Sequence, residues 1–337
     1  MSMLQRPTKK VFDQIKRLIE LGRRDTVDRL LNTLPFTHPT LSKMDQYELK
    51  MQAMALCHEE NKLNELMKSM AAEGVRPTRA AMRALLKMKI ERGQLEEAED
   101  IVLSLPKWGV DGVDCHMMCL LIVGWGKRRD AVGMQKCEDL FLKVPELHGN
   151  VYLATAMMTA YLDNDYPDRA IALYDRLRIS DPDPVLRKLL VRCLFKSLGR
   201  EQEALTEWEK IKNVTGPFDW LEMIKMISGR FPEKAIEMTR EYLLIQAGTT
   251  LTDLKVEKAT NLMLDIAMEC AVDGDTVKQL YTDALYLNKP VGKLLVKITE
   301  KARAIQDSNL MDFVREQVNM NEGTIHPFQL TAIRSRL

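Results

Sequence analysis

A helix-turn-helix unit of about 35 residues recurs along the chain and constrains its fold more than any other feature. In the clearest copy, residues 78–111, an apolar helical face runs to Gly93 and a second amphipathic helix follows from Leu95. Just before this copy, Gly74 is a natural helix stop and Pro77 suits the first turn of a new helix. Such units bury their apolar faces by stacking on their neighbours, so the sequence predicts an all-α fold, an α-solenoid of these repeats.

Further copies set the expected organisation. Residues 151–184 and 185–217 follow the same plan, and an alanine at one position of the second helix lets the two helices of a hairpin approach closely. These alanines are Ala98, Ala170, Ala204 and Ala235. We expect four parts: an N-terminal hairpin (1–44), clear repeats (45–217), degenerate helical repeats with a cap (218–318) and an extended C-terminal tail (319–337).

Four segments carry a family resemblance: 70–78, 93–98, 167–174 and 199–205. Over about residues 45–217 the chain resembles the pentatricopeptide repeat family. The tetratricopeptide repeat is the competing family, but its Trp-Leu-Gly-Tyr signature is absent here. The resemblance implies a right-handed superhelix whose first helices line the inner surface, and a role in organellar RNA metabolism.

The family also implies where RNA bases are read. Its members read one base per repeat, with one reader on the first helix about ten residues before the break and another at the last position of the repeat. Counting back places Met51, Arg83, Thr155 and Leu189 at the first reader position. Of these only Thr155 is a typical reader, and Met and Leu cannot hydrogen-bond a base. We therefore expect the base code to be lost and RNA contacts to involve backbone or shape.

Charge is balanced overall, with 49 basic and 48 acidic residues, so an electrostatic partner must be recognised locally. Basic residues recur every four positions on two predicted first helices and form stripes, which a phosphate backbone would bind. The first helix of 78–111 carries five bases against one acid, and its second helix four acids. The RNA-binding residues expected from these stripes are Arg79, Arg83, Lys87, Lys188, Arg192 and Lys196, and the resemblance adds Thr155 as a typical reader.

Other features point to less specific conclusions. Aromatic stacking platforms are few, with Trp125, Tyr161 and Trp220 as candidates that suit a core better. Residues 115–123 and 154–161 carry almost no charge, which fits either a thick core or a surface covered by a partner protein; we favour the partner.

Several function classes are excluded or unsupported. No run approaches the roughly 20 apolar residues of a membrane span. Cys115, His116 and Cys119 lack a second ligand pair for zinc, and the scattered cysteines suit a reducing compartment, so no metal or cofactor is expected. The phosphate-loop and catalytic motifs fail on spacing, so neither an enzyme nor a small-molecule substrate is predicted. The basic residues before residue 25 suit mitochondrial import, although the stretch also forms a good repeat.

Two functions remain. The first is a non-enzymatic scaffold in an organellar, mitochondrial ribonucleoprotein complex such as a mitoribosome or RNA-processing complex, which binds RNA backbone and protein subunits. Plastid and cytoplasmic locations are alternatives. The second is a protein-only adaptor that grips a partner helix or peptide in its concave face.

Overall fold

The computed structural model describes residues 6–144, 147, 149–177, 183–246, 254–286 and 291–337. Every regular element in these ranges is helical, so the all-α prediction is confirmed. The chain forms two compact units, residues 1–189 and 190–337, and the boundary falls within one helix, α11 (Pro184–Lys196).

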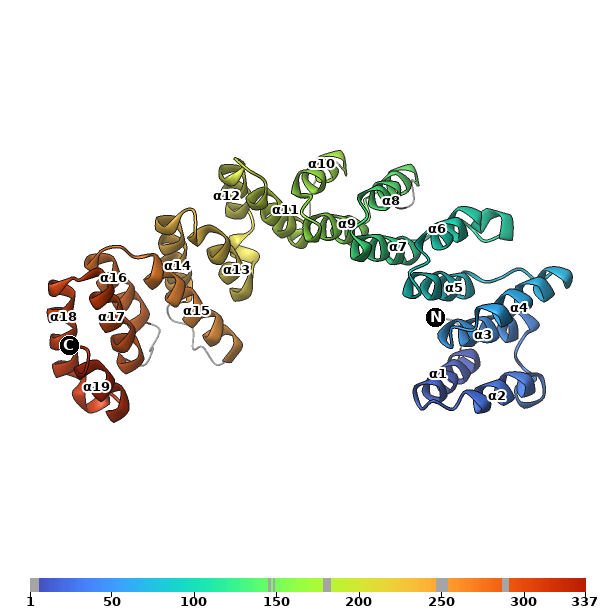
Figure 1. The fold of residues 1–337 in the computed structure, drawn as a ribbon, viewed down its shortest axis with the longest axis horizontal. Helices are drawn as coiled ribbons and strands as arrows, with labels where there is room; N and C mark the ends of the chain where they lie inside the picture. Colours follow the sequence, from blue (N-terminus) through green and yellow to red (C-terminus); the bar gives the residue numbers. More distant parts are fainter. Residues whose placement is uncertain (1–5, 145–146, 148, 178–182, 247–253, 287–290) are drawn as a thin grey trace. The chain divides into compact units, whose positions relative to one another are not determined.

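Unit 1 is a series of helix pairs in which a first helix is followed by a shorter or equal second helix (Figure 1). The first helices are α1 (Arg6–Glu20), α3 (Lys43–Leu56), α5 (Arg79–Glu91), α7 (Cys115–Arg128) and α9 (Val151–Asp163). The second helices are α2 (Arg24–Thr37), α4 (Glu60–Ala72), α6 (Leu95–Ser104) with the 3₁₀ turn η2 (Leu105–Trp108), α8 (Ala131–Lys143) and α10 (Pro167–Leu177).

Polar caps set the start of each repeat. Ser42, Thr78, Asp114 and Asn150 are 36 residues apart, and each side chain accepts a hydrogen bond from the backbone amide three residues later. This bond satisfies one of the free amides at a helix start and stabilises it by about 1 kcal/mol. Four caps at one spacing therefore define the repeat more sharply than its apolar pattern does.

A residue with left-handed backbone marks the turn between the two helices of each pair. Gly22 and Gly93 occupy it in two pairs, but His58, Arg129 and Asp165 hold the same conformation in the others. Glycine adopts positive φ freely and other residues rarely do. Sequence patterns that rely on glycine therefore miss three of these turns.

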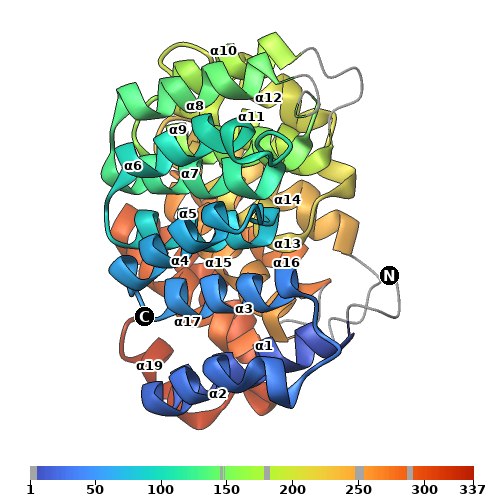
Figure 2. The ribbon, with the colours of Figure 1, turned by 90° about the vertical axis from the view of Figure 1, so that its right-hand side faces the viewer.

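The helices of unit 1 form two layers (Figures 1 and 2). Each first helix packs on the first helix of the next pair, for example α3 on α5 and α7 on α9, and also on its own second helix. We call α1, α3, α5, α7, α9 and the part of α11 in unit 1 the first-helix layer. The alanines predicted to sit at close helix contacts, Ala98, Ala170, Ala204 and Ala235, are fully buried.

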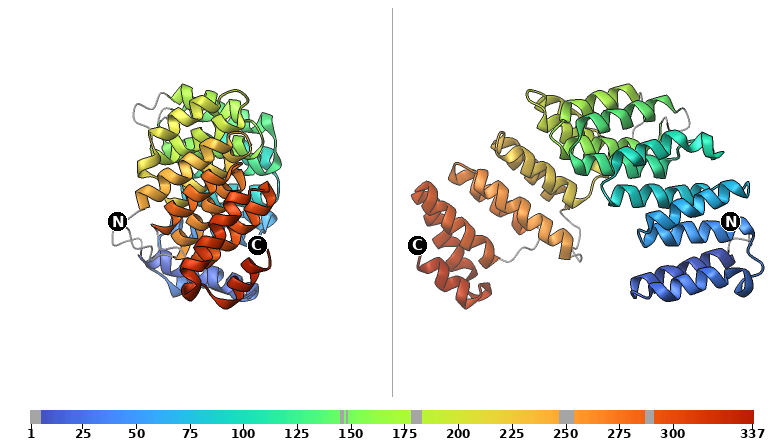
Figure 3. Two further views of the ribbon diagram at one scale, coloured as in Figure 1. Left: turned by 90° about the vertical axis from the view of Figure 1, so that its left-hand side faces the viewer. Right: turned by 45° about the vertical axis from the view of Figure 1, so that its right-hand side comes forward.

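Unit 2 continues the helix-pair plan (Figure 3). After the end of α11 come α12 (Glu201–Glu209), the turn η4 (Lys212–Val214), α13 (Pro217–Ser228), α14 (Pro232–Gln246), α15 (Leu254–Cys270), α16 (Gly274–Leu285), α17 (Val291–Ile305), α18 (Ser308–Asn321), the turn η5 (Glu322–Thr324) and α19 (Pro327–Arg334).

The prediction of an extended C-terminal tail is wrong. Helix α18 runs past residue 319, and α19 follows and packs against α17. Ile325 and Ile333 are buried in the unit 2 core, so this amphipathic segment closes the apolar end of the stack. The His326-Pro327 pair misleads because it starts a helix: the His326 side chain accepts from the Phe328 amide, and Pro327 occupies the first turn.

Candidate nucleic-acid interface

The predicted basic stripe of α5 lies on the open face of the first-helix layer. Arg79, Arg83 and Lys87 are 42, 40 and 52% exposed in their side chains, whereas Met82 and Leu86 on the same helix are fully buried. The spacing of four residues thus places the three cations together, as the sequence predicts.

The caps correct the register of the reader positions. Arg83 and Thr155 each lie five residues after a cap. The same count gives Tyr47 on α3, Cys119 on α7 and, from Asp183, Lys188 on α11.

The assignments of Met51 and Leu189 as readers are wrong. Met51 is fully buried and Leu189 nearly so. In α3 the true turn is at His58, which carries no glycine signal. In α11 Gly199 lies eleven residues after the reader position, as His58 does in α3, whereas the turn of the α5, α7 and α9 repeats lies ten residues after it.

The reader of the α5 repeat is held by the cap that starts the next repeat, Asp114. The Arg83 guanidinium donates through Nε to Asp114 Oδ2 at 2.8 Å, and Arg79 donates to the Asp111 carbonyl at 3.1 Å. Burial disfavours the Asp114 carboxylate, but hydrogen bonds from the Met117 amide and from Arg83 outweigh it and lower the pKa of Asp114. Asp114 therefore caps α7 as an anion and neutralises part of the stripe.

Other cations of the stripes also face acids. Lys87 lies 3.6 Å from Glu91, and in unit 2 Arg192 lies 3.0 Å from Glu222. On α11, Lys188 is half-buried and Lys196 is exposed.

Two bases counted with this helix, Lys89 on α5 and Arg92 directly after it, lie away from the open face. Lys89 is buried between Glu60 and Glu97, and Arg92 lies 2.6 Å from Glu60. Burial lowers the pKa of Lys89, but hydrogen bonds to the carboxylates of Glu60 and Glu97 outweigh this effect and raise the pKa above its usual value. These ion pairs join α5 to the second helices on both sides, so only three of the five bases form the stripe.

The sequence missed an interrupted row of exposed apolar side chains on the first-helix layer, which is present on α3, α9 and α11 but not on α5 and α7. Met44, Tyr152 and Val185 are each the second residue of a first helix, and Tyr152 is 62% exposed. By contrast, Trp125, Tyr161 and Trp220 are buried. These residues could have been predicted from the sequence by their position two residues after the cap of a first helix.

The side chains at the reader position, five residues after each cap, lie beside this row, and we call them the fifth-position side chains. The Thr155 hydroxyl donates to the Val151 carbonyl at 2.7 Å and keeps its acceptor lone pairs. Cys119 Sγ lies 3.5 Å from the Tyr152 hydroxyl of the next repeat. Adjacent repeats therefore share one surface.

The uncharged stretches are mainly core. Met117, Met118, Leu121 and Ile122 are buried in the stack, and within residues 115–123 only His116 and Val123 are exposed. The structure thus favours the thick core over the partner-covered surface that the sequence led us to prefer.

Among the residues that the structure describes, no three His, Cys, Asp or Glu side chains are grouped closely enough to hold a metal ion. None of the described helices combines the length and hydrophobicity of a membrane span.

The arrangement of helices is similar to that of solved pentatricopeptide repeat proteins. Two structures of PPR10 in complex with an 18-nucleotide psaJ RNA element align over 94% of this chain with a TM-score of 0.53, and PPR10 from maize aligns over the same share with 0.54. The chain has the fold of a pentatricopeptide repeat protein.

The likeness is one of fold, since sequence identity is 15%. The alignment covers 44 to 45% of the PPR10 chains, so this chain spans less than half their length. No protein-family model matches the chain, and no curated protein sequence matches it.

Proposed function

We propose that the chain is a non-enzymatic scaffold that binds single-stranded RNA along its first-helix layer, with little sequence preference. PPR10, a protein of similar fold, was solved twice with RNA bound. The same layer here offers both kinds of contact that a single strand uses, cations for phosphate and apolar surfaces for bases.

The observation that carries the proposal is a pair of side chains that recurs on two successive first helices. On α9 it is Tyr152 with Thr155, and on α11 it is Val185 with Lys188. Stacking on an aromatic side chain contributes about 1–3 kcal/mol per base and tolerates every base. A row of such pairs suits a strand that runs across successive repeats.

The ion pairs on this layer weaken phosphate binding but do not prevent it. Arg79, Arg83 and Lys87 stay 40% exposed or more. Exposed pairs contribute about 0–1 kcal/mol, so an RNA phosphate can replace a carboxylate partner at small cost.

Low sequence preference follows from the fifth-position side chains. Arg83 is engaged by Asp114, and Cys119 is a weak hydrogen-bond partner. Thr155 offers a neutral hydroxyl to a base edge, whereas the Tyr47 hydroxyl is hydrogen-bonded to Glu73, so most repeats lack a base-specific contact.

The test is the salt dependence of RNA binding. The variant R79E/R83E/K87E should lose most affinity for a mixed-sequence single strand. The slope of log K against log salt should fall by about 2 if all three cations contact phosphates, at ~0.7 per contact.

The matched control is R29E/K68E/K143E, which changes net charge equally at exposed positions on second helices. It should bind RNA nearly as well as the parent protein. Equal losses in both variants, with folding intact by circular dichroism, would show a nonspecific charge effect and reject the proposed surface.

A protein-only adaptor is the second candidate, favoured by the acids that face the stripes, such as Asp114 and Glu222. Purification from a native extract with and without ribonuclease separates the two. Partners that stay bound after nuclease treatment favour the adaptor.

We further propose that the RNA scaffold works in an organellar ribonucleoprotein complex, with mitochondria as the first choice, and binds protein subunits there. Support comes from the organellar role of the family it resembles and from the basic residues Lys9, Lys10, Lys16 and Arg17 in α1. Fractionation of cells that express the tagged chain, followed by identification of co-purifying RNA and protein, tests this. Exclusion from organelles would reject it.

A further inference from the structure

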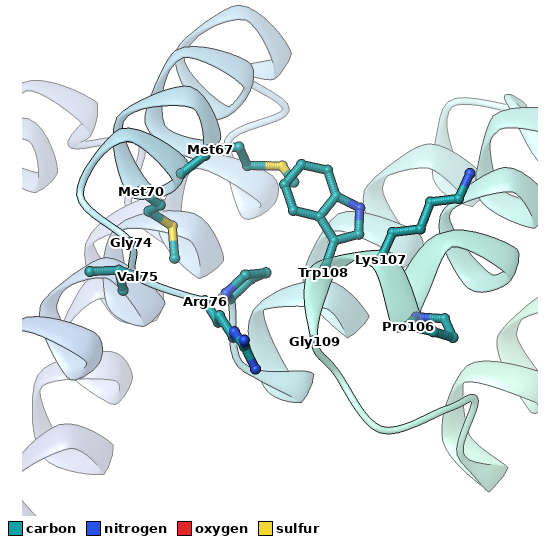
Figure 4. A pocket seen from close by; sticks show the side chains of 11 residues that line it. Met67, Met70, Gly74, Val75, Arg76, Pro106, Lys107, Trp108 and Gly109 are labelled. Atoms are coloured by element: carbon teal, nitrogen blue, oxygen red, sulfur yellow. The ribbon is translucent and has the colours of Figure 1, made fainter.

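A cavity of about 570 Å³ lies outside the first-helix layer, between two successive repeat ends (Figure 4). One side is formed by the end of α4 and the loop to Pro77, and the other by η2 and Gly109. Its size suits a small organic ligand.

The walls are apolar on one side and aromatic on the other. Met70 and Val75 line one side, and Figure 4 shows Trp108 on the other side with its indole beside Met67, Arg76 between the two sides, and the Lys107 amine directed away from Arg76. Trp108 is partly exposed, whereas the three other tryptophans of the chain are almost fully buried. Its indole ring is thus available as a stacking surface.

The cavity carries unopposed positive charge. None of the eleven residues that line it, all within the described ranges, is acidic. Within those ranges no carboxylate lies at ion-pair distance from Arg76 or Lys107, unlike Arg83 on α5. An anionic ligand would therefore meet two cations without having to displace an acid.

Gly109 leaves room for the Arg76 side chain. Its φ of +68° is left-handed, and a Cβ there would lie 2.8 Å from Arg76 Cδ and 2.9 Å from Nη1. The arginine side chain therefore lies directly against the glycine backbone. Any side chain at this position would displace the guanidinium from the cavity.

We propose that this cavity binds a phosphorylated nucleoside. The base stacks on Trp108 opposite the apolar wall of Met70 and Val75, and the phosphate binds Arg76, toward which the flexible Lys107 side chain at the rim turns on binding. A guanidinium matches phosphate oxygens in a bidentate manner, and the indole accepts any base. The ligand is either a free nucleotide or the phosphorylated end of an RNA strand.

Tryptophan fluorescence tests the site, because Trp108 is the one partly exposed indole. AMP and UMP should each quench it with saturation. Adenosine, which lacks the phosphate, and ribose 5-phosphate, which lacks the base, should each bind about tenfold more weakly or worse, as expected for loss of a charge-assisted contact or of stacking.

Variants show whether the fluorescence quenching comes from a ligand bound in this cavity. R76E should weaken AMP binding at least tenfold and W108L should abolish the quenching, while K143E, an exposed cation outside the cavity, should leave both unchanged. Because W108L risks the local fold, AMP binding to R76E and W108L is also measured by calorimetry after thermal melts. AMP affinity that survives R76E, or preference for an acidic aromatic peptide over AMP, overturns the proposal.

The source of the ligand is resolved with short RNA strands. Stronger quenching by a 5′-phosphorylated strand than by its 5′-hydroxyl form identifies an RNA end; equal quenching, with AMP still bound, identifies a free nucleotide. Binding of long RNA to R79E/R83E/K87E reports on the first-helix layer alone, so failure at one site is distinguishable from failure at the other.

Discussion

Replacement of Asp114 by asparagine should strengthen RNA binding while slightly weakening the fold. The side chain has two roles: it accepts the Met117 amide at 2.9 Å as the cap of α7, and it binds the Arg83 guanidinium at 2.8 Å. Asparagine caps a helix about as well as aspartate, so D114N removes mainly the charge. Loss of a partly exposed ion pair costs up to about 1 kcal/mol of stability.

The gain in RNA affinity follows from Coulomb's law. A phosphate on Arg83 would lie on the order of 7 Å from the Asp114 carboxylate, and in water two like charges at that distance repel by about 0.6 kcal/mol. Removing the carboxylate should therefore tighten binding roughly threefold, before any gain from the freed guanidinium. Fluorescence anisotropy with labelled single-stranded RNA at fixed salt measures this.

The companion variant D114A separates the helix-capping role of Asp114 from the effect of its negative charge on RNA binding. It should bind RNA as tightly as D114N but lose about 1 kcal/mol more stability, because alanine cannot cap α7. The pKa of Asp114 is lowered from 3.8, so its contribution to stability is present above that pH and is lost as pH falls through the lower folded value. D114N binding RNA as weakly as the parent, or more weakly, at pH 7 would refute the role assigned to this surface.

Three further predictions concern the fold. Gly133→Ala should cost about 1–3 kcal/mol because a Cβ there would meet an indole ring at 2.2 Å, whereas Gly112→Ala, with open space around it, should be close to neutral in urea titrations. Deleting residues 326–337 should lower the melting temperature of unit 2 and increase binding of a hydrophobic dye, because α19 covers its apolar end. Burial raises the pKa values of Cys137 and Cys193 to about 12, so both thiols should resist alkylation at pH 8 until the chain unfolds; rapid labelling of either in the native protein would contradict the packing.

The fold was predictable because its signals are local. Gly93, Pro77 and the buried alanine Ala98 mark helix ends and close contacts that depend on backbone chemistry within one unit. The C-terminal helix was missed because its start, His326-Pro327, looks the same in a loop and in a first helical turn.

The candidate site was predictable only in part. Four-residue spacing placed Arg79, Arg83 and Lys87 on one face, since helical periodicity is fixed. The partner Asp114 lies 31 residues from Arg83, and such long-range pairs leave no pattern in one sequence. The exposure of Tyr152 likewise depends on how neighbouring repeats pack.

The central claim is that RNA lies on the first-helix layer, and ultraviolet cross-linking with mass spectrometry tests it most directly. Cross-linked peptides should come from α5, α7, α9 and α11, with Tyr152 among the modified residues. Cross-links concentrated on α4, α6 and α8, away from the cavity beside Trp108, would contradict the account.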